Sequence, residues 1–174
     1  AGTVDGRKTA AYRSEPGVAP DSRIETFVAA RLFVDNWRWK DVPFYLRTGE
    51  RLAKKNTEIA VTFRQVPYSL FGSVGLGDLP ANVLVMQIQP EEGMSLRFQA
   101  KRPGSKICMG TLDMSFKYQE TFGVEMPESY ERLLLDCMSG DQTLFTRFDN
   151  IVVSWQLLDP ILTAWQKDPT APIL

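Results

Sequence analysis

The sequence predicts an α+β fold, in which a large, mainly antiparallel β-sheet is followed by C-terminal helices that pack on one of its faces. Two observations predict it. Five segments between residues 26 and 118 alternate apolar and polar residues, whereas apolar residues after position 128 recur at steps of three and four. Clean alternation is typical of antiparallel sheets with one solvated face, because parallel strands tend to be apolar on both sides.

The first strand is expected from Thr26 onward, where Val28 and Ala30 begin an alternating apolar face. Four more strands are predicted at 58–64, 83–89, 95–100 and 112–118. The residues between the later strands are rich in Pro, Gly and charge, as is typical of turns. Neighbouring strands are therefore expected to pair in sequence order.

Two helices are expected in the last third of the chain. The first follows Glu128 and ends near Gly140. The second begins after Asp149 or Asn150 as its N-cap, and Pro160 must kink it or split it. Its apolar stripe is expected to cover one face of the sheet rather than to hold a cofactor.

The chain is predicted to consist of an irregular N-terminal loop, 1–23, and a sheet-plus-helix domain, 24–174. The first range mixes Gly, Pro, Ser and charged residues, which favour turns and extended loops. The sequence starts without Met and ends on apolar residues. We therefore expect a domain cut from a longer chain.

The bulk composition excludes some partners. Twenty basic and 21 acidic residues give a net charge of -1, so nothing draws the chain generally toward nucleic acid or membrane, and any anion site must be local. No apolar run approaches the roughly 20 residues of a membrane span. We expect a cytoplasmic protein, and its hydrophobic content of 44% predicts a real core.

The residue types that carry most catalytic and metal chemistry are scarce. The chain has no histidine, which removes the commonest general base and most zinc sites. Cys108 and Cys137 lie beside apolar residues, and we interpret both as buried core residues in a reducing compartment. No metal site and no catalytic residue are predicted in this chain.

A basic cluster offers one candidate anion site. Arg47, Arg51, Lys54 and Lys55 are expected in a loop just before a strand, where several side chains can converge on one anion. An ordinary solvated loop is the alternative interpretation, because a single basic run is a weak signal.

Residues 35–49 carry a more specific pattern. They read DNWRWKDVPFYLRTG, which resembles the glucose-6-phosphate dehydrogenase pattern of an Asn-x-Arg-Trp run, then Gly-Val-Pro-Phe and an Arg-x-Gly turn. The resemblance continues in order through residues 88–92, 112–116, 128–136 and 144–147. It covers essentially the whole chain but only the C-terminal domain of a bacterial-type family member. It identifies the chain as a fragment that lacks the N-terminal coenzyme domain.

The resemblance implies a role within a larger enzyme. The family transfers a hydride from carbon 1 of glucose 6-phosphate to NADP in the pentose phosphate pathway, and a histidine of the missing domain acts as base. This chain is then the substrate-binding and dimerisation domain, inactive alone, in a homo-oligomer formed through the β-sheet. NADP is expected mainly on the missing domain, and no cofactor is expected on the fragment.

Substrate-binding residues carry over by position. Lys55 matches a family Lys or Arg that contacts the substrate phosphate. Glu50 stands where members usually have a second lysine; it cannot make that contact, although it can accept hydrogen bonds from sugar hydroxyls. Arg51 is an alternative source of the missing charge. Gln89 matches a glutamine near the sugar, and a sheet residue bonded to backbone is the alternative.

A second, structural NADP site is not expected. Asn56, Ala60 and Gln87 stand where some animal members have basic residues for that coenzyme.

Two other function classes stay open. A non-catalytic interaction or regulatory module on the same domain is mildly favoured by Glu50, whereas an autonomous enzyme would need a base for which no constellation is visible.

Overall fold

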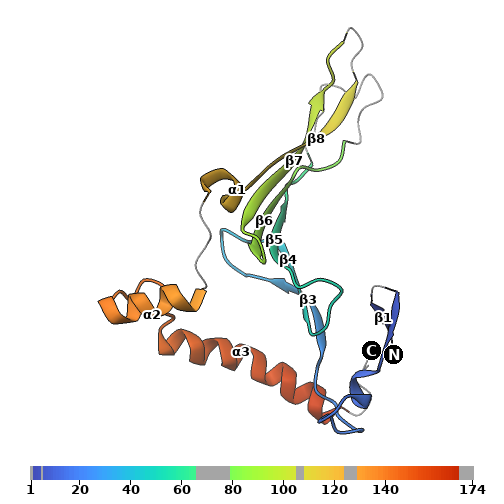
Figure 1. Cartoon of the computed structure of the whole chain (residues 1–174), viewed down its shortest axis with the longest axis vertical. Coiled ribbons are helices and arrows are strands. Elements are labelled where there is room, and N and C mark those ends of the chain that lie inside the picture. The colour runs from blue at the N-terminus through green and yellow to red at the C-terminus, as the bar shows by residue number, and fades with distance from the viewer. Residues whose placement is uncertain (1, 5, 66–78, 105–107, 124–128, 169–174) are drawn as a thin grey trace. The chain divides into compact units, whose positions relative to one another are not determined.

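The computed structural model describes residues 2–4, 6–65, 79–104, 108–123 and 129–168 (Figure 1). It divides the chain into two compact units. The hairpin unit contains Ala1–Ala53 and Ser129–Leu174, and the sheet unit contains Lys54–Glu128. The boundary predicted between residues 23 and 24 stays a prediction.

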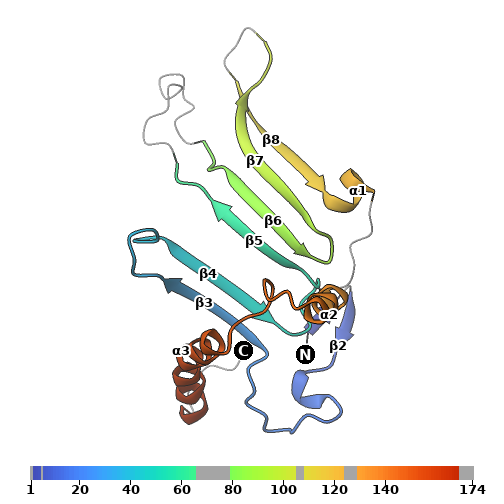
Figure 2. The ribbon, with the colours of Figure 1, turned by 90° about the vertical axis from the view of Figure 1, so that its left-hand side faces the viewer.

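The sheet unit is built on four antiparallel strands, which lie side by side in sequence order (Figure 2). They are β5 (Thr57–Thr62), β6 (Val83–Gln89), β7 (Gly93–Lys101) and β8 (Met109–Lys117). These strands and their pairing in sequence order were predicted. A short helix that was not predicted, α1 (Tyr118–Phe122), follows β8 directly and ends at Gly123, whose left-handed backbone suits glycine.

The register divides this sheet into an apolar and a polar face. Leu84, Leu96 and Met114 lie opposite one another across β6, β7 and β8. Residues two apart along a strand share a face. The apolar face consists of Ile59, Val61, Leu84, Met86, Met94, Leu96, Phe98, Leu112, Met114 and Phe116. The polar face includes Ser95, Arg97, Gln99, Thr111, Asp113 and Ser115.

The hairpin unit begins with two antiparallel hairpins. The first pairs β1 (Gly2–Val4) with β2 (Arg7–Thr9), and the second pairs β3 (Phe27–Phe33) with β4 (Pro43–Gly49). Only β3 was predicted. The small hairpin and a 3-10 turn, η1 (Tyr12–Ser14), lie in the range expected to be irregular. Strands of three residues are too short to show alternation in the sequence.

The C-terminal helices also belong to the hairpin unit. Helix α2 (Ser129–Ser139) ends as predicted at Gly140, whose φ is 74°. Helix α3 (Phe148–Lys167) begins before the predicted caps, because Arg147 occupies the N-cap position and Asp149 lies inside the first turn. An acidic residue there favours the helix through its dipole. Pro160 lies within α3 and does not split it.

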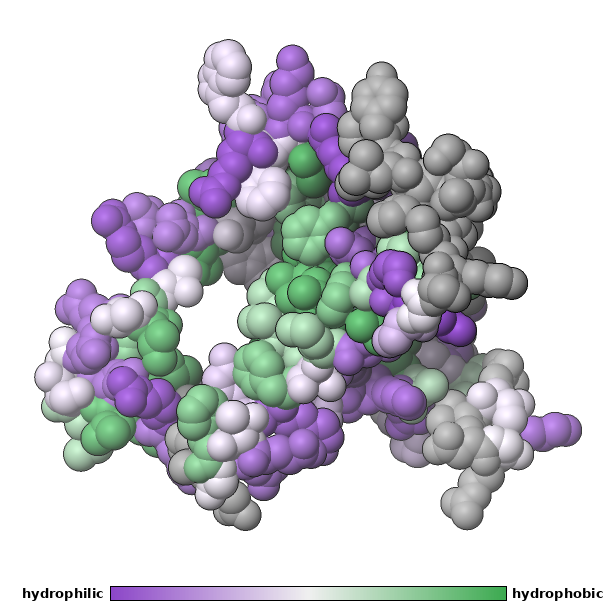
Figure 3. All heavy atoms as spheres, turned by 90° about the horizontal axis from the view of Figure 1, so that it is seen from above, coloured by the Kyte–Doolittle hydropathy of each residue, from purple (hydrophilic) through white to green (hydrophobic). Residues whose placement is uncertain are grey.

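The expectation of a core is wrong for the described residues. None of their hydrophobic side chains is buried, and helix α3 has no buried residue. Figure 3 accordingly shows hydrophobic side chains at the surface. The described residues of the sheet unit form one sheet and one five-residue helix, whereas a core needs two packed layers. The α+β class, with antiparallel sheets and C-terminal helices, is confirmed.

The interpretation of the two cysteines as buried core residues is also wrong. Cys108, which precedes β8, and Cys137, which lies in α2, are both exposed free thiols. Among the described helices, none is long and apolar enough to cross a membrane. The described residues include no group of three or more His, Cys, Asp or Glu placed to hold a metal ion.

Candidate functional site

The four residues predicted to bind substrate divide between the two units. Glu50 and Arg51 follow β4 in the hairpin unit, whereas Lys55 and Gln89 belong to the sheet unit. The basic cluster divides in the same way. Arg47 lies within β4 and not in a loop, which corrects the prediction, and Lys54 belongs to the sheet unit with Lys55.

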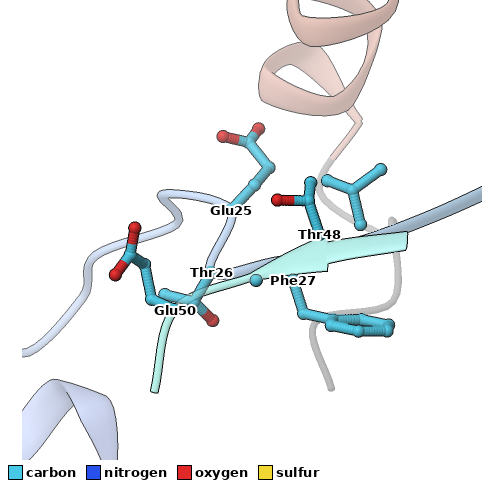
Figure 4. Close-up of a pocket in the computed structure, with 7 residues that line it drawn as sticks. Glu25, Thr26, Phe27, Thr48 and Glu50 are labelled. Atoms are coloured by element: carbon cyan, nitrogen blue, oxygen red, sulfur yellow. The ribbon is translucent and has the colours of Figure 1, made fainter. Parts of the chain in front are cut away.

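A pocket opens at the end of the β3–β4 hairpin, with a volume of about 170 Å³ (Figure 4). The hairpin register places Phe27 opposite Gly49. The backbone N–H of Glu50 then donates to the carbonyl oxygen of Thr26 at 2.8 Å, which extends the pairing beyond the strand. This pairing brings Glu50 beside the start of β3. The lining residues are Glu25, Thr26, Phe27, Val28, Thr48, Gly49 and Glu50.

Gly49 has no side chain, which allows Phe27 and Thr26 to lie directly against its backbone. A β-carbon there would stand 2.8 Å from Cδ2 of Phe27 and 3.1 Å from the carbonyl oxygen of Thr26. Figure 4 shows the side chains of Glu25 and Thr48 on one side of the ribbon and the Phe27 ring on the other. Glycine therefore permits the close approach of the two paired segments of the hairpin at the pocket.

The pocket is acidic. Glu25 and Glu50 contribute carboxylates, and none of the seven lining residues is basic. Like charges repel, so this lining disfavours a phosphate group. A carboxylate accepts hydrogen bonds, so the same lining suits hydroxyl donors such as those of a sugar.

Arg51 is already engaged with another residue of its unit. Its Nη1 forms an ion pair and hydrogen bond with Oε1 of Glu15. The backbone of Arg51 has a φ of 52°, in the left-handed region that residues with a β-carbon adopt infrequently. The role predicted for Arg51 as a second source of positive charge stays a prediction, and the carboxylate of Glu15 already neutralises part of that charge.

Lys55 and Gln89 lie toward the same end of the four-stranded sheet. Gln89, the last residue of β6, pairs in register with Thr57, the first residue of β5, and Lys55 precedes that strand by two residues. Both side chains belong to exposed residues. Among the described residues, no carboxylate lies within ion-pair distance of Lys55.

Two residues of the hairpin unit were missed in the sequence. Glu25 lines the pocket, and Glu15 pairs with Arg51 across 36 residues of sequence. No local motif marks either residue, because each is brought to its place by the pairing of distant segments.

Comparison with known proteins identifies relatives along the whole chain. The family model described as "Glucose-6-phosphate dehydrogenase, C-terminal domain" matches residues 1–173. A glucose-6-phosphate 1-dehydrogenase of Chlamydia pneumoniae is 45% identical over 96% of this chain and 33% of its own length. One from Treponema pallidum is 43% identical over 100% of this chain and 34% of its own. The chain therefore spans about one third of these relatives' length.

Solved structures agree with the sequence relatives. A glucose-6-phosphate dehydrogenase in complex with its substrate glucose-6-phosphate matches with a TM-score of 0.84 and 36% identity, over 98% of this chain and 34% of that one. The glucose-6-phosphate 1-dehydrogenase from Mycobacterium avium matches with a TM-score of 0.70 and 38% identity, over 87% of this chain and 32% of that one.

Proposed function

Because the chain belongs to the family of glucose-6-phosphate dehydrogenase C-terminal domains, we propose that it is the substrate-binding and dimerisation domain of a glucose-6-phosphate 1-dehydrogenase. The whole enzyme oxidises D-glucose 6-phosphate with NADP to 6-phosphogluconolactone, in the pentose phosphate pathway of the cytoplasm. The match of residues 1–173 to the family model carries this proposal. The relative whose solved structure holds glucose-6-phosphate supports the substrate.

Lys55 is the residue proposed to bind the substrate's phosphate. A phosphate is attracted to an ammonium group that no carboxylate neutralises, and Lys55 has no such partner among the described residues. Glu50 is proposed to accept hydrogen bonds from sugar hydroxyls, because its carboxylate in an acidic pocket cannot hold phosphate. Gln89 is proposed as a further contact to the sugar. These roles rest on the resemblance. Glu50 belongs to the hairpin unit, and Lys55 and Gln89 belong to the sheet unit.

The acidic pocket at the end of the β3–β4 hairpin does not fit the phosphates of NADP. The pocket carries two carboxylates and no basic side chain among its lining residues. The chain also has no histidine to act as general base. When bound to the complete enzyme, NADP accepts the hydride. This chain's proposed part is to hold the sugar phosphate, and alone it is proposed to be inactive.

Association between copies is proposed to use the sheet. The apolar face of β5–β8 includes Met114, which is 59% exposed, and Leu112, which is 51% exposed. A contiguous apolar face of this kind is typical of a surface that another molecule covers. A two-fold pairing of identical faces is the commonest way to cover it in a homo-oligomer.

A dehydrogenase assay tests the proposed function. We expect the complete product of the gene to reduce NADP with glucose 6-phosphate, and the purified 174-residue chain to show no turnover. Turnover by this chain alone would contradict the proposal. Absence of turnover in both would instead favour a non-catalytic interaction or regulatory module built on the same domain.

A pair of neighbouring lysines sharpens the assay. In the complete protein, Lys55→Ala is expected to raise the KM for glucose 6-phosphate roughly tenfold or more, because a charge-assisted contact to the phosphate is lost. Lys54→Ala removes the same charge one residue away and is the matched control, with an expected change of less than about twofold. Equal effects of the two substitutions would count against a specific contact by Lys55.

A further inference from the structure

The ion pair between Glu15 and Arg51 connects the N-terminal segment to the bend that follows β4. The two residues are 36 positions apart, and Arg51 Nη1 bonds Oε1 of Glu15. The guanidinium side chain is 68% exposed, whereas the carboxylate side chain is only 16% exposed. A carboxylate that is partly shielded from water attracts a cation more strongly than a fully solvated one. Glu15 is therefore the more shielded member of this ion pair, and Arg51 is the more exposed one.

The backbone around Arg51 is constrained as well. Arg51 has a φ of 52°, which a residue with a β-carbon adopts only infrequently. The preceding residue, Glu50, is fixed by its backbone hydrogen bond to Thr26. The bend is therefore held at one end by the hairpin ladder and at Arg51 by Glu15.

An incoming phosphate meets different situations at the two cations. At Arg51, which follows the carboxylate of Glu50 in sequence, it approaches a guanidinium whose charge is already paired with the carboxylate of Glu15. At Lys55 no carboxylate lies within ion-pair distance among the described residues. Coulomb repulsion from these carboxylates disfavours phosphate at Arg51.

We propose that Glu15 is a positioning residue that determines specificity: by neutralising the charge of the Arg51 guanidinium, it disfavours anion binding at Arg51 and leaves the phosphate to Lys55. This inference rests on the proposed function, because it concerns how the substrate's phosphate is selected. It assigns a role to a half-buried carboxylate outside the pocket, and it removes Arg51 from the set of phosphate ligands.

Titration of the full 174-residue chain with inorganic phosphate, followed by NMR, tests the proposal. Glu15→Gln releases the guanidinium, so we expect phosphate to bind about threefold to tenfold more tightly than in the wild type. The double variant Glu15→Gln/Arg51→Gln should lose that gain. Arg51→Gln alone should change the phosphate affinity by less than about twofold. A merely structural role of Glu15 would not produce a gain that depends on Arg51.

A charge-swapped variant guards against loss of folding. Glu15→Arg/Arg51→Glu restores an ion pair with reversed charges, and we expect wild-type phosphate affinity from it. Glu15→Asp shortens the carboxylate and should give a smaller gain in the same direction. An unchanged affinity in both Glu15→Gln and Glu15→Asp overturns the proposal, and so does a loss in Arg51→Gln as large as that in Lys55→Gln.

Failure of the proposed function is distinguishable from failure of this inference. If the complete gene product does not oxidise glucose 6-phosphate, but Glu15→Gln gains phosphate affinity that Arg51→Gln removes, the function fails and the inference stands. If the enzyme is active and Glu15→Gln gains nothing, the inference fails alone.

Discussion

Gly93 lies so close to the neighbouring strand that a β-carbon placed on it would stand 2.7 Å from the backbone carbonyl oxygen of Phe116. Gly93 begins β7, pairs in register with Lys117 of β8, and is the buried residue of that strand. A backbone oxygen held in a ladder cannot move aside as a side chain can. The start of β7 therefore requires glycine for close packing.

Gly93→Ala is predicted to lower the free energy of unfolding by about 1–3 kcal/mol, as overpacking against a fixed backbone does. Gly110→Ala is the matched control on the adjacent strand, because a β-carbon there would meet Nε of Arg102 at 2.8 Å, near the movable end of a long side chain. We expect that change to cost less than about 0.5 kcal/mol. Urea unfolding followed by circular dichroism measures both, and equal losses would contradict the packing argument.

The two faces of the sheet predict effects of different size on self-association. Met114 lies on the apolar face, and its neighbour Ser115 lies on the polar face of the same strand. Met114→Lys is expected to raise the dissociation constant of the oligomer roughly tenfold or more, because burying an unpaired ammonium is unfavourable. Ser115→Lys should change it less than about twofold. Sedimentation at several concentrations measures both constants, and the reverse order of effects would move the interface to the polar face.

The positions of the strands in the sheet unit could be predicted because their signal is local. Alternation at 57–62, 83–89, 93–101 and 109–117 follows from the two-residue period of a strand. The strand Pro43–Gly49 was missed because its sequence, PFYLRTG, does not alternate and begins with proline. The family resemblance covered those residues without revealing their conformation.

Burial and side-chain partners could not be predicted from local patterns. An apolar residue such as Met114 is buried only when a second layer covers it, and the sequence does not show which layer does so. The pairing of Glu15 with Arg51 joins segments 36 residues apart, and no period or motif encodes it. Aspartate is favoured at N-cap positions, but the N-cap predicted from Asp149 was wrong, because the helix begins after Arg147.

The loop after α2 holds a carboxylate with a shifted titration. The Thr143 hydroxyl donates to Oδ1 of Asp141 at 2.6 Å, and the Thr143 backbone N–H donates to the same oxygen at 2.9 Å. These bonds, with a smaller contribution from Arg132, lower the pKa of Asp141 below its ordinary value of 3.8. A carboxyl whose pKa is lower in the folded state stabilises the fold above the unfolded value, and this contribution disappears as the pH falls through the folded value.

Thr143→Val is predicted to raise the pKa of Asp141, because it removes the larger of the two hydrogen bonds and keeps the backbone donor. NMR titration of the Asp141 carboxyl measures this. The stability difference between the variant and the wild type should be present at neutral pH and shrink below about pH 4. An Asp141 pKa that is the same in both proteins would show that the hydroxyl does not hold the carboxylate in solution.

Glu50 stands in an acidic pocket where relatives of this family are expected to carry a lysine, and reversing its charge separates two interpretations. Glu50→Lys is predicted to tighten the binding of inorganic phosphate to the chain by about tenfold, because repulsion is replaced by a charge-assisted contact. Glu25→Lys makes the same change of charge at the other carboxylate of the pocket, and it controls for the general electrostatic effect. We expect it to tighten binding by less than about threefold.

Comparing glucose 6-phosphate with inorganic phosphate separates a hydrogen bond from Glu50 to the sugar from the effect of its negative charge on phosphate. If Glu50 accepts hydrogen bonds from hydroxyls, Glu50→Lys in the complete enzyme should bind phosphate more tightly and yet lose preference for glucose 6-phosphate over inorganic phosphate. The two ligands compete, so this loss can be measured in an inhibition assay. The ratio of the KM for glucose 6-phosphate to the inhibition constant of phosphate should rise. A ratio that stays constant or falls would show that Glu50 makes no useful contact to the sugar, and that a lysine at this position serves the substrate at least as well.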